Sequence, residues 1–351
     1  SGGGWQTIIL SSLDTRVTLA DPVAGYSSFR TRAYHLKDLG DSEQTPNDLA
    51  TICDYTHLTA MMAPRPTLLT FNLHDSCCFE GDYAIQPLLD AAKPIFHVLG
   101  CENSLRWHIN DDPPGVHNYD VDNRQQFYRM LGDFFFANDK RFDSKEIPSD
   151  DEVKSEQDLL VEMPDKNDTL NSLALELAHA LPHASDLPNT RNAATSWQTS
   201  NRGRLGKIVR IKDYRVRAIR HGDEEKSDVR ATYWTLHMGT AWTVPAVELV
   251  KGDPTRTAIL VADAGRRSVA ADAARLLDTG HRVVAVDPFF FGESKIEKRD
   301  FLFALLVAAV GDRPLGLQAS QLAAVAQWLK DRHTGQNVTL VARGPRSSLF
   351  A

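Results

Sequence analysis

The chain has 351 residues, of which 42% are hydrophobic and 24% are charged, so we expect a packed globular core and not wholesale disorder. The formal net charge of −7 argues against a nucleic-acid partner and against binding to an anionic membrane. The longest apolar run, Phe301 to Val310, is too short to span a bilayer and is typical of a buried helix. Composition leaves the oligomeric state open.

The four cysteines, Cys53, Cys77, Cys78 and Cys101, all lie in the first third of the chain. They form no Cys-x-x-Cys pair and no zinc-like spacing, and the adjacent Cys77 and Cys78 could bridge only with backbone strain. We therefore expect reduced structural thiols, no metal and no cofactor.

The first 136 residues alternate between short apolar runs and helical patterns. The pattern predicts helices over Trp5–Leu13, Leu58–Met62, Tyr83–Ala92 and Asn123–Phe136, and strands over Arg16–Ala20, Thr67–Asn72 and Pro94–Leu99. Strands that alternate with helices in this way indicate an α/β fold whose mostly parallel sheet is covered by helices on both faces.

The remaining chain divides into a linker and a second α/β region. Residues 138–170 are rich in Asp, Glu, Lys and Pro, which is typical of a linker, and Leu173–Leu181 follows as a short helix. Predicted strands are Lys207–Ile211, Arg215–Ile219, Ala231–Leu236, Val244–Leu249, Ala258–Ala262, Arg282–Val286 and Asn337–Val341, and predicted helices are Ala270–Asp278 and Ser320–Lys330. We place the boundaries at 1–137, 138–203 and 204–351.

The two ends of the chain share a pattern. Gly344 to Ala351 follows a predicted strand and begins a helix, and Ser1 to Thr7 begins a helix that would need a strand before it. If Gly344 corresponds to Ser1, the chain covers about one period of a tandem array. It would then run from the middle of one unit to the middle of the next, so we expect it to be cut at both ends.

Residues 1–136 resemble the α/β-hydrolase superfamily, most closely its acetyl-xylan-esterase and dienelactone-hydrolase-like branch. Ser1-Gly2-Gly3 resembles the second half of the G-x-S-x-G turn that carries a nucleophilic serine. Glycines beside such a serine let the strand and helix pack closely, and the amide of Gly2 would stabilise an oxyanion at the helix N-terminus.

Two further residues follow in the order that the resemblance implies. Asp75 comes after the strand Thr67–Asn72, and His117 lies in Gly115-Val116-His117-Asn118-Tyr119, just before the last helix of this region. His117 would take the proton of Ser1 and later protonate the leaving alcohol, and Asp75 would fix the imidazole tautomer. The resemblance therefore implies a catalytic triad of Ser1, Asp75 and His117.

Other residues compete for these roles. Asp21, after the predicted strand Arg16–Ala20, is the second choice for the acid, and Asp54 is a weaker choice. His108 and His74 are more typical of packing or structural histidines. Cys77 lacks the glycines that a nucleophilic turn requires.

Residues 257–351 resemble the front half of another α/β-hydrolase unit, but Gly344 stands where a serine would be expected. This departure predicts a non-catalytic copy. Gly265-Arg266-Arg267 lacks the glycine spacing and the lysine of a phosphate-binding loop. We therefore expect its arginines to be surface or interface groups.

The resemblance implies a serine esterase that acts on short acyl groups, including acetyl groups on a carbohydrate. The rivals are a non-catalytic scaffold module and a peptidase or thioesterase of the same fold. The family often works outside the cytoplasm, but the sequence shows no export signal. Because the strands and the loop that normally precede the nucleophile are missing before Ser1, we expect the isolated chain to be inactive.

Overall fold

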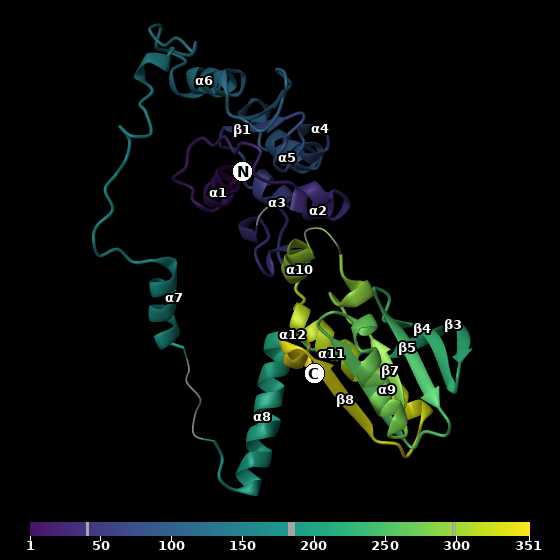
Figure 1. Ribbon diagram of the computed structural model, residues 1–351. Helices are drawn as coiled ribbons and strands as arrows, with labels where there is room; N and C mark the ends of the chain where they lie inside the picture. Colours follow the sequence, from purple (N-terminus) through teal and green to yellow (C-terminus); the bar gives the residue numbers. More distant parts are fainter. Residues whose placement is uncertain (40–41, 182–186, 297, 299) are drawn as a thin grey trace.

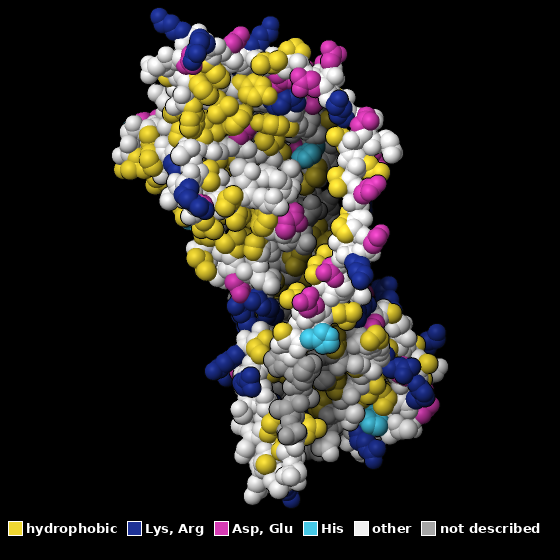
Figure 2. Space-filling model, turned by 90° about the vertical axis from the view of Figure 1, so that its left-hand side faces the viewer, with side chains coloured by type: hydrophobic (Ala, Val, Ile, Leu, Met, Phe, Trp, Pro, Cys, Tyr) yellow, Lys and Arg dark blue, Asp and Glu magenta, His cyan; other side chains and the backbone are white. Residues whose placement is uncertain are grey.

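The computed structural model describes residues 1–39, 42–181, 187–296, 298 and 300–351. Two bulky parts meet at a narrow waist, and a long chain segment connects them on the outside (Figures 1 and 2). The first part holds the N-terminus beside α1 (Gly2–Leu13), and the second part holds the C-terminus beside α12 (Pro345–Phe350).

The first part is built around two parallel strands. These are β1 (Thr67–Asn72) and β2 (Leu105–Asn110), paired from Thr67 with Leu105 through Asn72 with Asn110. The chain at Ala20 and Val23 pairs in parallel with Thr67 and Thr70, so it adds a third, short row to the sheet. The carboxyl ends of all three rows therefore lie at one edge.

Helices cover these strands with apolar side chains. They are α1, α2 (Phe29–Tyr34), α3 (Tyr55–Ala60), α4 (Gly81–Ala84), α5 (Gln86–Val98) and α6 (Val121–Phe135). One core joins Ile8 of α1, Leu58 of α3 and Phe96 of α5 to Leu69 and Phe71 of β1. Every side chain of β1 is buried, as its apolar run predicts.

Two predicted strands of this part are wrong. Arg16–Ala20 contains only the single bridge at Ala20. Pro94–Leu99 belongs to α5 and its end, because Leu88, Leu89, Ala92 and Phe96 share a buried helical face while Pro94 stays at the surface. The strand that precedes His117 is β2, which sequence analysis missed.

The middle of the chain makes few tertiary contacts. Residues 138–169 contain no helix longer than one turn, and α7 (Leu170–His179) stands apart from both bulky parts (Figure 1). The helix α8 (Arg191–Val209) buries no residue and packs near its end against α11 (Pro314–Arg332). The predicted strand Lys207–Ile211 is wrong, because its first three residues complete α8.

The second part contains a six-stranded sheet in the order β3-β4-β5-β7-β6-β8. The strands are β3 (Val216–Lys226), β4 (Val229–Met238), β5 (Trp242–Lys251), β6 (Arg256–Ala262), β7 (His281–Val286) and β8 (Val338–Arg343). The β3–β4, β4–β5 and β5–β7 pairs are antiparallel, and only β7–β6 and β6–β8 are parallel.

The expectation of a mostly parallel sheet is therefore wrong for this larger sheet. Two residues connect β3 to β4 and three connect β4 to β5, and such short turns can join only antiparallel strands. The parallel pairs occur where α9 (Ala270–Asp278) or the longer helical stretch of α10 (Asp300–Ala309) and α11 provides the crossover.

Helices cover both faces of the parallel strands. Ile259 and Val261 of β6 pack in one core with Leu322 and Leu329 of α11. The alternate residues Leu260 and Ala262 pack in another core with Ala273 and Leu277 of α9. This division follows from the two-residue alternation of side chains along a strand.

Polar and apolar contacts join the two parts. The Asp48 carboxylate binds the guanidinium groups of Arg210 (2.6 Å) and Arg313 (2.7 Å), and Lys and Arg side chains lie at the waist (Figure 2). Ala309 of α10 is buried in the core of the first part, with Leu306 packed against it. Within the described ranges, no strand of the two-stranded sheet pairs with a strand of the six-stranded sheet.

Within the described residues, no single helix is long and apolar enough to cross a bilayer. Phe301–Ala309 and Pro314–Arg332 meet that test only as a pair, by length and composition alone, with an 89° bend between them.

Close packing at Gly4 positions the start of α1. A Cβ atom on Gly4 would overlap the carbonyl of Val23 and the backbone of Gly25, whereas one on Gly3 would meet only Ser1 Oγ at 3.9 Å. We predict that Gly4→Ala lowers the free energy of unfolding by about 1–3 kcal/mol, because the overlap must be relieved by a backbone shift. Urea unfolding measures the effect.

Gly3→Ala is the matched control, because it adds the same methyl group to the same helix in open space. We expect it to leave stability unchanged or slightly raised. Equal stability of the two variants would show that the approach of α1 to Val23 and Gly25 is not tight.

Candidate active site

A buried carboxylate stands directly after β1. Asp75 is fully buried, and its Oδ1 accepts hydrogen bonds from the backbone amides of Cys77 and Cys78, both at 2.9 Å. Its Oδ2 lies 2.7 Å from His117 Nδ1. Burial raises the pKa of Asp75, but the His117 contact and the two amides outweigh burial, so the net pKa is lowered.

His117 lies in the loop of residues 111–120 that follows β2, here called the His117 loop. With Asp75 at Nδ1, a neutral imidazole that donates to the carboxylate presents Nε2 as an acceptor. The side chain of His117 is 31% exposed, so this nitrogen can reach a pocket. An imidazole held in this tautomer can accept a proton at Nε2.

Ser1 caps the N-terminus of α1. Its nitrogen donates to the Ala24 carbonyl at 2.9 Å, and its hydroxyl makes no capping bond to the helix. The amides of the first helical turn, including that of Gly2, have no intrahelical partner, so they favour negative charge in front of the helix. A serine hydroxyl and an anion-stabilising helix end thus lie together.

One pocket of about 380 Å³ brings these groups to the same place. It is lined by Ser1, Gly3, Gly4, Thr7, Asp21, Val23, His117, Asn118 and Tyr119. Both Ser1 and His117 are among the described residues, and no hydrogen bond joins the Ser1 hydroxyl to the imidazole there. Such bonds are often long in the absence of substrate and tighten when it binds.

Asp21, the second choice for the acid, has other partners. Its Oδ1 accepts from the Thr70 hydroxyl at 2.7 Å and its Oδ2 from the Tyr119 hydroxyl at 2.8 Å. Burial raises the pKa of Asp21 from 3.8 to about 6, although these hydrogen bonds and the charge of His108 oppose the rise. Asp21 lines the pocket beside His117 without binding its ring.

Two of the remaining candidates, Asp54 and His108, bind structural partners. Asp54 caps α3, accepting from the amides of Tyr55 (2.6 Å) and Phe29 (3.0 Å). His108 Nε2 lies 2.6 Å from Asp122 Oδ2, joining β2 to α6.

Two more candidates lie beside Asp75. His74 is exposed, and Cys77 is a free thiol whose backbone amide, not its sulfur, supports Asp75. In the described part of the chain, no group of three His, Cys, Asp or Glu side chains is placed to hold a metal ion.

The residues that support the His117 loop were not predicted from the sequence. Asn72 and Asn110 end β1 and β2, and both are buried. Asn110 and Asn123 donate to the Asn118 side-chain oxygen at 3.2 and 3.1 Å, and Asn72 donates to the Asn118 carbonyl at 3.3 Å. An asparagine at the end of each apolar strand would have been the signal, but β2 was not predicted.

The corresponding turn of the second part is built differently. Gly344 precedes α12 with a φ of +115°, and a Cβ there would overlap the Asp263 carboxylate. That carboxylate accepts from the amides of Ser347 (2.6 Å) and Arg346 (3.1 Å). Position 344 carries no nucleophilic side chain, and the amides of this helix end already bind the Asp263 carboxylate.

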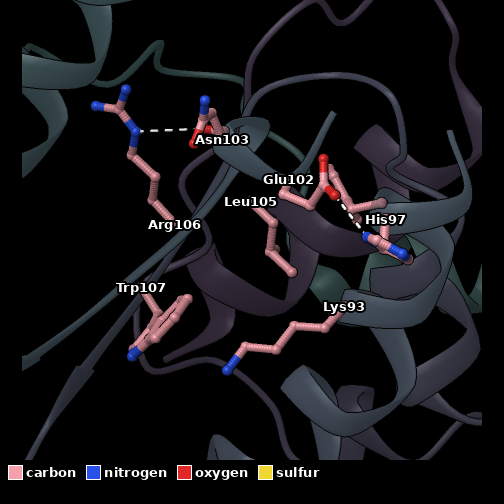
Figure 3. Close-up of a pocket in the computed structure, with 8 residues that line it drawn as sticks. Lys93, His97, Glu102, Asn103, Leu105, Arg106 and Trp107 are labelled. Atoms are coloured by element: carbon pink, nitrogen blue, oxygen red, sulfur yellow. Dashed lines mark hydrogen bonds and ion pairs between the residues drawn. The ribbon is translucent and has the colours of Figure 1, made fainter. Parts of the chain in front are cut away.

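A second hollow, of about 560 Å³, lies between the end of α5 and β2 and contains neither Ser1 nor His117. Figure 3 shows Lys93 extending toward the ring of Trp107, where its Nζ lies 4.1 Å from the ring centroid, and His97 paired with Glu102 at 2.6 Å. The hollow offers an aromatic surface and charged groups but no nucleophile–base pair.

Comparisons with known proteins give distant structural similarity only. No family model matches the chain, and no curated protein matches it. A protein assigned as an acetyl xylan esterase from Bacteroides fragilis NCTC 9343 matches with 14% identity and a TM-score of 0.45, over 53% of this chain and 56% of that one.

Two other solved structures match more weakly. A cold-adapted esterase from an Arctic intertidal metagenomic library matches with 15% identity and a TM-score of 0.29, over 38% of this chain and 56% of that one. The methylesterase BT1017 matches with 15% identity and a TM-score of 0.34, over 44% of this chain and 37% of that one. The chain thus spans about half the length of the structures that it matches, and at these scores the likeness assigns no activity.

The raised pKa of Asp21 predicts an effect of pH on stability. Because the folded state holds this proton more tightly than the unfolded state, the contribution of Asp21 to stability is largest below about pH 4 and falls as pH rises to about 6. We predict that Asp21→Asn, which mimics the protonated form, gains roughly 1–3 kcal/mol relative to wild type between about pH 4 and pH 7.5.

Urea unfolding of both proteins across this range measures the difference. The lowered pKa of Asp75 produces a slope of opposite sign, but it is common to both proteins and cancels in the comparison. If the stabilities of the two proteins changed in parallel across this pH range, the raised pKa of Asp21 would be contradicted.

Proposed function

We propose that the protein is a serine ester hydrolase in which Ser1 is the nucleophile, His117 the general base and Asp75 the residue that orients His117. The observation that carries this proposal is the 2.7 Å contact between Asp75 and His117 at a pocket that Ser1 also lines. Asp75 and His117 follow the neighbouring parallel strands β1 and β2, and Ser1 lines the same pocket as His117, which supports the proposal.

The chemistry follows from these positions. His117 Nε2 accepts the proton of the Ser1 hydroxyl while Ser1 Oγ attacks the ester carbonyl, and the Gly2 amide stabilises the resulting oxyanion. The imidazolium then protonates the departing alcohol, leaving an acyl group on Ser1. Attack by water, with His117 again as base, releases the acid and restores the serine. Asp75 stays ionised and stabilises the imidazolium throughout.

The residues that line the pocket favour substrates that are short acyl esters of an alcohol with further hydroxyl groups. Gly3 and Gly4 leave little but backbone beside Ser1, and the volume of about 380 Å³ suits a small ligand. Thr7 and Asn118 offer hydrogen-bonding groups to the alcohol part of the substrate, such as a sugar ring. In the second part, Gly344 and Asp263 are consistent with a non-catalytic unit.

A fluorophosphonate probe tests the proposal, because it reacts only with an activated serine. We expect an adduct on Ser1, located by peptide mass spectrometry, that is absent in Ser1→Ala. His117→Ala should slow labelling by about 100-fold or more, because it removes the base. Ser11→Ala, a change at another serine of α1, is the matched control and should label normally.

Turnover of p-nitrophenyl acetate is a separate measurement. Turnover that is lost in Ser1→Ala would support the esterase, whereas turnover that Ser1→Ala leaves unchanged would contradict the role of Ser1 as nucleophile. Absence of a Ser1 adduct would overturn the esterase and favour a scaffold role.

A further inference from the structure

The segment of residues 20–25 touches both halves of the proposed catalytic pair. On one side it supports α1, because the Ser1 nitrogen donates to Ala24 and Gly4 packs against Val23 and Gly25. On the other side it contacts the His117 loop, because Asp21 accepts the hydrogen bond of Tyr119 at 2.8 Å. The nucleophile and the base are thus connected through one short stretch of chain.

The other anchors of the His117 loop make this connection only indirectly, through β1, where the Ala24 amide donates to the Thr70 carbonyl at 2.8 Å. Asp75 follows β1, and Asn72, Asn110 and Asn123 belong to β1, β2 and α6, so they hold the loop to the strands behind it. They fix the orientation of the imidazole relative to the sheet. In the part of the chain that the structure describes, no hydrogen bond joins any of these four side chains to α1 or to residues 20–25.

We propose that the hydrogen bond between Asp21 and Tyr119 sets the distance between the side chains of Ser1 and His117, which makes Asp21 and Tyr119 positioning residues. The inference rests on the proposed function, since it assigns a role relative to that pair of residues. Asp21 is suited to this role because a second bond, from the Thr70 hydroxyl at 2.7 Å, holds its carboxyl group to β1. Tyr119 follows His117 by two residues, so its displacement moves the base.

This tether, the hydrogen bond between the Tyr119 hydroxyl and the Asp21 carboxyl group, does not require a negative charge on Asp21. An electrostatic role of Asp21 would require that charge, so substitutions can distinguish the two roles. Tyr119→Phe and Asp21→Leu both remove the bond, whereas Asp21→Asn removes only the charge and can still pair with the tyrosine hydroxyl. Tyr34→Phe, at a tyrosine that is 75% exposed and lies outside the pocket, is the matched control.

The first experiment does not depend on activity. In protein with selectively labelled serine and histidine, we measure the nuclear Overhauser effect between the Ser1 β-protons and the His117 ring, and the Nδ1–H resonance of His117. We expect Tyr119→Phe and Asp21→Leu to weaken the Ser1–His117 effect while the Nδ1–H resonance, which reports the bond to Asp75, is kept. Asp21→Asn and Tyr34→Phe should match wild type.

The second experiment uses the rate of Ser1 labelling by the fluorophosphonate. A misplacement of the base by about 1 Å predicts a loss of roughly 10- to 100-fold in Tyr119→Phe and in Asp21→Leu. The double variant should be no slower than either single variant, because both changes break the same bond. With p-nitrophenyl acetate, kcat should fall while KM changes little.

The outcomes separate this inference from the proposed function. Failure of wild-type Ser1 to label would overturn the esterase, and the spectroscopic measurement would still decide whether the tether exists. Labelling of wild type together with unchanged behaviour of Tyr119→Phe would overturn the tether alone. If Asp21→Asn abolished labelling while Asp75→Asn did not, Asp21 would be the acid of the triad, and the tether would again be wrong.

Discussion

A carboxylate without solvent contact is the constraint on which the site depends. An ionised group in the interior is unstable unless hydrogen-bond donors replace water, and Asp75 has two backbone amides and the His117 ring around it. The amides come from the turn after β1 and the ring from the loop after β2, so the carboxylate is satisfied only when both strands are paired in register. Pairing of the two strands therefore also orients the imidazole.

The buried asparagines behind the His117 loop also require hydrogen-bond partners. Asn110 and Asn123 both donate to the side-chain oxygen of Asn72, at 3.1 and 3.0 Å, and both also reach Asn118. Buried amides are costly when unpaired, so this set favours a single loop conformation in which most of their polar atoms have partners. The loop is held by hydrogen bonds at Asn118, whereas the His117 side chain is partly exposed at the pocket.

The N-termini of α1 and α12 show how similar local structure can serve different purposes. At α1, the serine hydroxyl is not used to cap the helix, and Ser1 lines a pocket. At α12, Asp263 binds the first amides and fills the space beside Gly344. A helix N-terminus attracts an anion in either case, but an internal carboxylate leaves no room for an external one.

The sequence by itself determined the elements whose signal is local. The buried strand β1, the amphipathic helix α6 and the alternation of β6, α9 and β7 follow from apolar periodicity. Ser1, Asp75 and His117 were candidates implied by the resemblance to α/β-hydrolases. Local patterns misjudged Pro94–Leu99, because an apolar run of that length fits a strand or a helix, and contact with the core decides between them.

Tertiary structure alone decided how distant parts meet. The antiparallel half of the larger sheet depends on the close pairing of β3, β4 and β5, and the junction at Asp48 depends on arginines that lie far away in sequence. The partners of Asp21 are likewise set by packing, since nothing near Asp21 in the sequence points to Tyr119. A chain can specify its own helices and strands residue by residue, but the distances between side chains in a site are fixed only when those elements pack.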